Sequence, residues 1–233
     1  MTALLASVRS YDEACDAAQA GAELIDLKEP REGALGGVAV DEIARIVQAL
    51  RGRFPVKPIS ATIGDVPNEA LDEIATRVIG VSDTGVDYVK VGVSPGASAR
   101  ACLAHLASLP AAVVPVLLCD EGVDAALSDY AAGLGFAGIV FDTATKNGRT
   151  LFDCVDMDTL ARCLATIGAR GAMTGVAGSL GWAQLAQIHA LKPDIAGFRT
   201  ALCTKGRSTR LDPGHVARWA DALHHAPQDA RTM

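Results

Sequence analysis

Four apolar, strand-like segments of this chain each carry one charged residue near their carboxyl end. These residues are Lys28, Lys90, Asp142 and Arg199, and the intervals between them are 62, 52 and 57 residues. An ammonium group inside a buried strand costs several kcal/mol unless it faces a polar cavity or a partner. Four such residues at a regular interval predict a single active site, and the two lysines indicate imine chemistry.

Both lysines are expected to lie near carboxylates, with Asp26 below Lys28 on the same strand face and Asp142 on a later strand. Desolvation and mutual repulsion lower the pKa of a buried amine, so part of it is neutral and nucleophilic near pH 7. The other lysine can then act as an acid and return as a base. A lone strand-end lysine would more often extend its ammonium into water, but the convergence of two lysines with two carboxylates favours catalysis.

These residues belong to a regular alternation of apolar runs and amphipathic segments. The predicted strands are residues 3–8, 23–28, 57–63, 86–92, 112–119, 138–143, 171–177 and 195–200. The predicted helices are residues 11–20, 40–52, 67–83, 97–108, 123–133, 156–168, 180–190 and 213–225. Apolar runs without strict alternation are typical of parallel strands buried on both faces. Eight such units predict a single (β/α)8 TIM barrel over residues 1–225, with a polar tail at 226–233; an open doubly wound sheet is the alternative.

In a barrel the four charged residues would fall on the second, fourth, sixth and eighth strands. Side chains from alternate strands share one interior layer, and the active site lies at the carboxyl ends of the strands. The four side chains are therefore expected to lie in one layer at that mouth. Ser60 and Thr62 on the third strand add polar groups that we expect to contact the substrate.

The loops after the seventh and eighth strands are the usual phosphate-binding loops of such barrels. Gly178 and Ser179 follow the seventh strand and open a predicted helix, while Arg199 ends the eighth. We expect a helix N-terminus and a forked guanidinium to bind phosphate there; a plain helix cap by Ser179 is the alternative. Lys146, in the loop after the sixth strand, would serve as a phosphate ligand or a third catalytic amine.

Composition excludes several other classes of function. A net charge of −6 and a pI near 5.3 argue against nucleic-acid binding, which needs a basic face. The sequence holds no run of apolar residues long enough for a membrane span, and its six scattered cysteines predict reduced thiols in a cytoplasmic protein. The five histidines lack ligand spacing, so no metal is expected. The glycine motif at residues 133–138 precedes a strand, so it is not a dinucleotide site.

Several longer motifs resemble those of the (5-formylfuran-3-yl)methyl phosphate synthase family, also called 4-(hydroxymethyl)-2-furancarboxaldehyde-phosphate synthases. The resemblance covers nearly the whole chain and is carried by residues 21–36 around Lys28, residues 60–67, residues 87–92 around Lys90, and residues 142–153. It implies a barrel enzyme similar to class I aldolases. Such enzymes condense two molecules of glyceraldehyde 3-phosphate into a phosphorylated furan aldehyde, a precursor of methanofuran-type C1 carriers, with loss of phosphate and water.

By this resemblance, Lys28 forms the Schiff base, Lys90 transfers protons, and Asp142 and Lys146 support them. The chain departs from the archaeal pattern of the family at residues 200–207, which puts the phosphate contacts of that loop in question. No cofactor is implied, and a homo-oligomer that takes a triose phosphate as substrate is expected. The alternatives are another class I phosphosugar aldolase, or a non-catalytic barrel that senses a phosphorylated metabolite.

Overall fold

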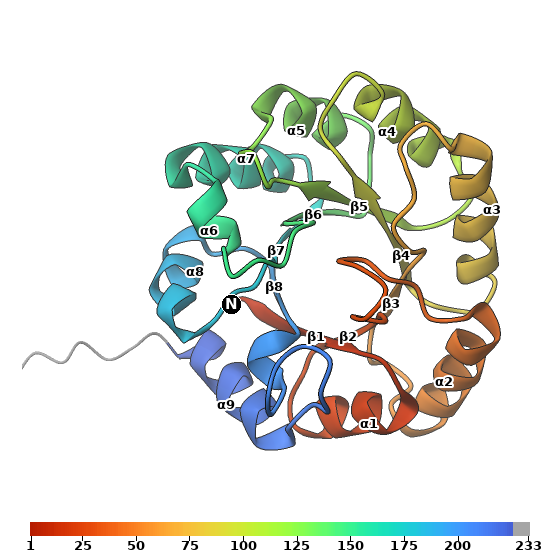
Figure 1. Cartoon of the computed structure of the whole chain (residues 1–233), viewed down its shortest axis with the longest axis vertical. Coiled ribbons are helices and arrows are strands. Elements are labelled where there is room, and N and C mark those ends of the chain that lie inside the picture. The colour runs from red at the N-terminus through yellow and green to blue at the C-terminus, as the bar shows by residue number, and fades with distance from the viewer. Residues whose placement is uncertain (226–233) are drawn as a thin grey trace, which may run out of the picture.

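Eight short apolar segments form parallel strands that pair in sequence order and close into a barrel (Figure 1). The strands are β1 (Ala3–Val8), β2 (Leu24–Leu27), β3 (Ile59–Thr62), β4 (Tyr88–Val93), β5 (Val113–Leu118), β6 (Gly138–Asp142), β7 (Met173–Val176) and β8 (Ile195–Phe198). Because β1 pairs with both β2 and β8, the sheet has no free edge. The predicted TIM barrel is confirmed, and the open doubly wound sheet was the wrong alternative. The computed structural model describes residues 1–225; the expected polar tail, 226–233, lies outside them.

Helices surround the barrel and follow the strands in alternation (Figure 1). They are α1 (Tyr11–Gln19), α2 (Val40–Arg53), α3 (Leu71–Ser82), α4 (Ala99–Ser108), α5 (Ala125–Ala132), α6 (Leu151–Cys154), α7 (Met157–Ala169), α8 (Leu185–Leu191) and α9 (Pro213–His224), with short 3-10 turns η1 (Trp182–Gln184) and η2 (Thr200–Leu202). Several begin at a side chain that accepts a backbone N–H of the first turn: Ser10, Asp124, Asp156 and Asp212. The short helix α6 was not predicted from the sequence.

Apolar side chains fill two separate regions of the fold. The larger core lies between the barrel and its ring of helices. Inside the barrel, Leu5, Leu24 and Ile195 close the amino-terminal end. Farther along the barrel interior, Val114 and Val116 of β5 form part of a second apolar cluster. These interior clusters leave the carboxyl ends of β2, β4 and β6 for polar side chains.

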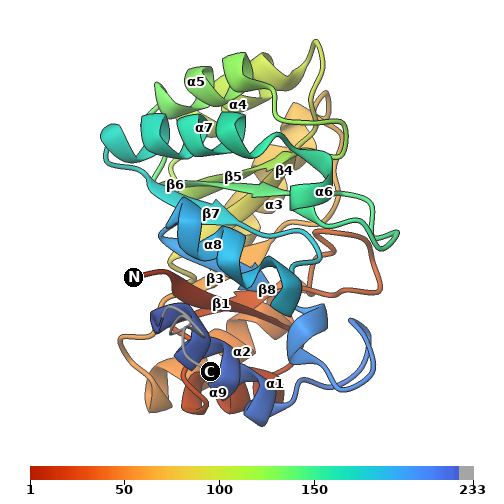
Figure 2. The same ribbon diagram turned by 90° about the vertical axis from the view of Figure 1, so that its left-hand side faces the viewer.

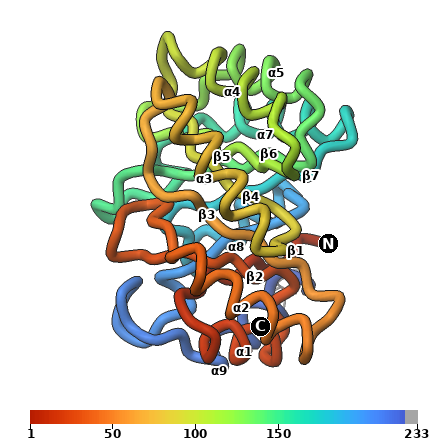
Figure 3. The backbone as a smooth tube through the Cα atoms, turned by 90° about the vertical axis from the view of Figure 1, so that its right-hand side faces the viewer, coloured from red at the N-terminus to blue at the C-terminus, as the bar shows by residue number. Residues whose placement is uncertain are grey.

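The loops that follow β2, β6 and η2 leave the barrel at the same end, opposite the N-terminus, as Figures 2 and 3 show from two sides. Strand register brings polar residues together beneath this end. Ser7 on β1 is aligned with Asp26 on β2, and Asp26 is aligned with Ser60 on β3. Thr62 on β3 is aligned with Lys90 on β4. The parallel register thus places a polar group on each of four consecutive strands.

Candidate active site

Lys28 directly follows β2 and is 7% exposed, with its side chain lining a cavity at the carboxyl-terminal mouth. Within residues 1–225 its Nζ has no hydrogen-bond or ion-pair partner. Burial lowers the pKa of Lys28 to about 8, although the charges of Asp142 and Asp26 oppose this shift. A buried amine with a lowered pKa and no bound partner has the properties of a nucleophile for a carbonyl.

Lys90 on β4 has the opposite environment, because its ammonium is held by a carboxylate. Its Nζ lies 3.1 Å from Asp26 Oδ2, and both side chains are buried. Asp26 also accepts hydrogen bonds from the hydroxyls of Ser7 (3.0 Å) and Ser60 (2.7 Å). Burial alone raises the pKa of Asp26, but the charges of Lys90 and Lys28 outweigh it, so the pKa is lowered. The ion pair fixes the position of the Lys90 side chain beside the cavity.

A second carboxylate and lysine pair lies at the end of β6. Lys146 Nζ donates to Asp142 Oδ1 (2.9 Å) and to the carbonyl and hydroxyl oxygens of Thr143. Burial raises the pKa of Asp142, but the charges of Lys146 and Lys28 outweigh this effect and lower it. The other carboxylate oxygen, Oδ2, receives no hydrogen bond from the described residues. This oxygen is therefore available to a substrate group or to the amine of Lys28.

The cavity brings together most of the predicted catalytic residues. Lys28, Lys90, Asp142 and Lys146 line it, whereas Asp26 lies beneath and contacts the lining residues Lys90 and Ser7. Its volume is about 40 Å³, which is room for about three water molecules.

The prediction for Arg199 does not agree with the structure. Its side chain forms a buried, two-pronged ion pair with Glu13 on α1, at 2.6 and 3.2 Å. The remaining guanidinium N–H groups donate to the carbonyls of Ser7, Arg207 and Thr209. All five N–H groups of a guanidinium are thereby occupied. Arg199 lines the same cavity as the lysines but anchors the loop after η2 and has no N–H group left for a phosphate, so this geometry does not support the expected phosphate contact.

Three other predicted ligands have different positions from those expected. The hydroxyl of Ser60 is bound to Asp26, and that of Thr62 donates to the carbonyl of Gly36 (3.0 Å); neither residue lines the cavity. Gly178 and Ser179 do line it. Ser179, however, has a φ of +54° and does not open a helix, because helical structure starts only at η1. The expected helix N-terminus at Ser179 is therefore absent.

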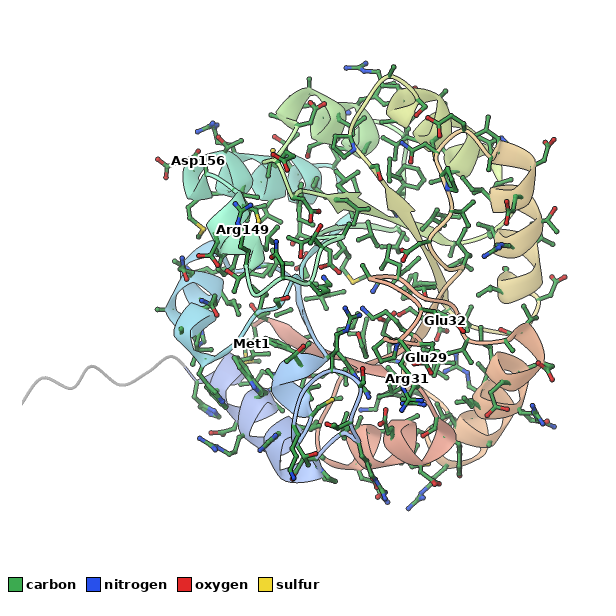
Figure 4. All side chains as sticks on the ribbon, in the orientation of Figure 1. Met1, Glu29, Arg31, Glu32, Arg149 and Asp156 are labelled. Carbon is green, nitrogen blue, oxygen red and sulfur yellow. The ribbon has the colours of Figure 1, made fainter. Side chains whose placement is uncertain are left out.

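The loop between β2 and α2 contributes a residue that the sequence did not reveal. Leu35, 1% exposed, packs inside the barrel with the β5 valines. Asp65 accepts hydrogen bonds from the backbone N–H groups of Ala34 and Leu35. Gly92 leaves room for the leucine, since a Cβ there would lie 2.6 Å from Leu35 Cδ1. The glycine-rich composition signalled a functional loop, but no sequence feature showed that its leucine fills the barrel. Glu29, Arg31 and Glu32 belong to the same loop (Figure 4).

Arg207, in the loop between η2 and α9, also lines the cavity and was not assigned a role from the sequence.

No group of three or more His, Cys, Asp or Glu residues within residues 1–225 is arranged to hold a metal ion. No helix in that range is long and apolar enough to cross a membrane.

Comparison with known sequences gives one consistent family. The model of the 4-HFC-P synthase family matches residues 4–220. A relative from Methylorubrum extorquens, provisionally named (5-formylfuran-3-yl)methyl phosphate synthase, is 37% identical over 226 residues, which cover 97% of this chain and 93% of the relative. The (5-formylfuran-3-yl)methyl phosphate synthase of Methanopyrus kandleri is 31% identical over 239 residues, covering 94% and 98% of the two chains. That of Archaeoglobus fulgidus is 28% identical over 235 residues, covering 95% and 99%.

Solved structures that resemble this barrel share its fold at low sequence identity. The 3-hexulose-6-phosphate synthase of Salmonella typhimurium superimposes with a TM-score of 0.64 at 19% identity, covering 96% of this chain and all of that one (100%). Phosphoribosyl anthranilate isomerase from Thermus thermophilus gives a TM-score of 0.62 at 13% identity, covering 96% and 98%. At these identities the likeness concerns the fold alone.

Proposed function

The chain belongs to the 4-HFC-P synthase family, and on that premise we propose that it condenses two molecules of glyceraldehyde 3-phosphate into (5-formylfuran-3-yl)methyl phosphate through an imine on Lys28. The observation that carries this proposal is the contrast among the three lysines of the cavity. Lys90 and Lys146 are each held by a carboxylate, whereas Lys28 has no partner among the described residues and a pKa of about 8.

Imine formation would begin with the neutral amine of Lys28, which attacks the aldehyde carbon of one triose phosphate. The resulting carbinolamine loses its hydroxyl as water, and this step needs a proton. By the family resemblance Lys90 donates this proton, and its side chain lines the same cavity as Lys28. Having given up this proton, the amine of Lys90 is a base. Asp26 keeps Lys90 in place during both steps.

The iminium would then acidify the neighbouring C–H bond, and neutral Lys90 would remove that proton to give an enamine. The enamine electrons can expel the phosphate from the β carbon, leaving a three-carbon unit bound to Lys28. Carbon–carbon bond formation with the second triose phosphate, ring closure and loss of water lead to the furan. Aromatic stabilisation of the product makes the sequence favourable, and the enzyme would serve methanofuran-type cofactor synthesis.

Asp142 and Lys146 would support this chemistry from the other side of the cavity. Asp142 Oδ1 is held by Lys146 and by the backbone N–H of Thr143 (2.7 Å), so its position is rigid. Its unoccupied Oδ2 can accept a proton from the substrate hydroxyl groups or orient the amine of Lys28. Lys146 keeps this carboxylate ionised and adds positive charge next to the phosphorylated substrate.

Borohydride reduction tests the proposal directly. Protein incubated with glyceraldehyde 3-phosphate and borohydride should gain one triose-derived mass on the peptide that contains Lys28. Unreduced samples should show furan absorbance with release of phosphate. Lys28→Arg is the matched variant, because it keeps the positive charge but cannot form the imine.

The outcomes separate the proposed function from its alternatives. Labelling of Lys28 without furan would indicate a different class I aldolase. The absence of any trapped adduct in the wild-type protein would indicate a barrel that only binds the metabolite. A label found only on Lys146 would overturn the assignment of the nucleophile.

A further inference from the structure

Five cationic side chains line the cavity: Lys28, Lys90, Lys146, Arg199 and Arg207. A phosphate ligand needs N–H groups that are not already bound to the protein. Lys146 and Arg199 fail this condition, because all their N–H groups are bound within the protein. Lys90 is paired with Asp26 and is assigned to proton transfer in the proposed function. Lys28 is needed for the imine of the proposed function. Arg207 is the remaining cation.

The guanidinium of Arg207 is only partly used by the protein. Its Nη2 donates to the carbonyl of Gly33 at 2.9 Å. Within residues 1–225, its Nε and Nη1 have no acceptor. Ser179 and Thr200 line the same cavity at the ends of β7 and β8, and their hydroxyls likewise have no partner there. A guanidinium with free N–H groups beside two free hydroxyls is suited to a phosphate monoester.

The backbone of Arg207 is anchored to the barrel by the residue first expected to bind phosphate. Arg199 Nε donates to the carbonyl of Arg207 (2.8 Å), and Arg199 itself is fixed by the buried ion pair with Glu13. Arg199 Nη2 also donates to the carbonyl of Thr209 (2.8 Å). The loop is therefore held at Arg207 itself and at Thr209, so the Arg207 side chain extends to the cavity from an anchored backbone.

The contact between Arg207 and Gly33 joins this loop to the lid loop, which we define as residues 29–37. Gly33 has a φ of +109°, and a Cβ there would collide with Asp65. Its carbonyl is oriented because the N–H of Ala34, in the same peptide plane, donates to Asp65 Oδ2 at 3.1 Å. The lid loop is also held by Asp65, by Thr62, by an ion pair between Arg9 and Glu29, and by the interior position of Leu35. None of these groups lines the cavity, whereas Arg207 does.

We infer that Arg207 binds the phosphate of the triose substrate and that its hydrogen bond to Gly33 couples phosphate binding to closure of the lid loop; this inference rests on the proposed function for the identity of the ligand. No residue of the lid loop lines the cavity, whose volume is about 40 Å³, so the hydrogen bond from Arg207 to Gly33 joins a cavity-lining side chain to that loop. A phosphate bound to Nε and Nη1 orders the guanidinium, and the bond to Gly33 then costs less entropy to form. Coupling of this kind is reciprocal, so closure also strengthens phosphate binding.

Inorganic phosphate is the probe for the first half of the inference. Titration calorimetry on the full chain should show that Arg207→Gln weakens phosphate binding by about 10- to 100-fold, since charge-assisted hydrogen bonds are lost. Arg207→Lys keeps the charge without the forked geometry, so its affinity for phosphate should lie between those of the wild type and Arg207→Gln. Lys205→Gln removes an exposed charge from the same loop and should change the affinity by less than about twofold. Equal affinity in the wild type and Arg207→Gln would overturn the assignment.

Hydrogen–deuterium exchange tests the coupling. Saturating phosphate should slow exchange of the peptide covering residues 29–37 in the wild-type protein and in Lys205→Gln. In Arg207→Gln, at a phosphate concentration that saturates the variant, this protection should disappear. If the protection persists in the saturated variant, the proposed coupling to the lid loop is wrong, and Arg207 is at most a phosphate ligand.

A third measurement keeps the inference distinct from the proposed function. Borohydride trapping with glyceraldehyde, which lacks the phosphate, should proceed equally in the wild type and in Arg207→Gln. The wild type should be trapped more efficiently by glyceraldehyde 3-phosphate than by glyceraldehyde, and Arg207→Gln should show no such preference. If neither aldehyde is trapped by the wild type, the proposed function fails. The phosphate titration then still tests whether Arg207 binds phosphate. If both proteins prefer the phosphorylated aldehyde equally, Arg207 is not the phosphate ligand.

Discussion

Lys90 and Asp26 form a buried ion pair at 3.1 Å directly beneath the cavity that Lys28 enters with a free amine. Under the proposed function, this relationship gives the two lysines different tasks. The carboxylate holds the side chain of Lys90 in place, and the positive charge of Lys90 adds to the effect of burial in lowering the pKa of Lys28. One lysine is therefore suited to proton transfer and the other to nucleophilic attack.

Lys90→Met should separate these tasks. We expect the variant to be trapped by borohydride on Lys28 but to form furan about 10²- to 10⁴-fold more slowly, as is typical for a missing acid–base group. Loss of the Lys90 charge should also raise the pKa of Lys28, so trapping should shift to higher pH. Mass spectrometry of the reduced protein and furan absorbance are the two measurements.

The double variant Lys90→Met with Asp26→Asn is the control for that experiment, because it removes the carboxylate left without its cation. If trapping disappears in both variants at every pH, Lys90 is itself the nucleophile. If furan forms at the wild-type rate, Lys90 has no part in the reaction.

The pH dependence of imine formation should follow the titration of Lys28. Only the neutral amine attacks the aldehyde, so the initial rate of trapping should rise about tenfold per pH unit below pH 8 and level off above it. The charge of Asp142 raises the pKa of Lys28, so Asp142→Asn should move the inflection to lower pH. A rate that does not depend on pH between 6 and 9, to within about twofold, would contradict this assignment.

Stability should show the cost of keeping Lys28 buried. Its pKa is about 8 in the folded chain against an ordinary value of 10.5, a difference equivalent to about 3 kcal/mol. Below pH 8 the lysine is protonated in both states and the folded state carries this cost. As pH rises from about 8 to 10.5 the folded state binds fewer protons than the unfolded state, so stability rises.

Lys28→Met should therefore be inactive but up to about 3 kcal/mol more stable than the wild type at pH 7, with the difference vanishing above about pH 10.5. Urea denaturation at several pH values measures this. Lys205→Met, at an exposed position, should change stability by less than about 0.5 kcal/mol. A destabilised Lys28→Met variant at pH 7 would show that the amine stabilises the fold.

Arg199→Met should act on stability before it acts on substrate binding. It leaves the Glu13 carboxylate buried without its cation, which should cost about 3–5 kcal/mol. Adding Glu13→Gln should recover part of this loss, because the uncompensated charge is removed. A wild-type melting temperature combined with a raised KM would instead restore Arg199 as a direct phosphate ligand.

The sequence by itself determined the barrel and the identity of its central lysines. Strands buried on both faces are recognisable as short, continuous apolar runs. Because side chains alternate between the two faces of a strand, the sequence also indicates which of them point inward. Lys28, Lys90 and Asp142 could be placed at the mouth for this reason, since their depth follows from their position at a strand end.

Only the tertiary structure decided which of the polar groups are already occupied. Arg199 looked like a free cation because its partner, Glu13, lies 186 residues away in the chain. Arg207 went unnoticed because the carbonyl that orients it, that of Gly33, is 174 residues away. Strand periodicity depends on neighbours along the chain, whereas a hydrogen-bond partner depends on which loops meet in space. For that reason the pattern of residues could locate the site, but the closed barrel alone distinguishes its reactive groups from the groups that hold it together.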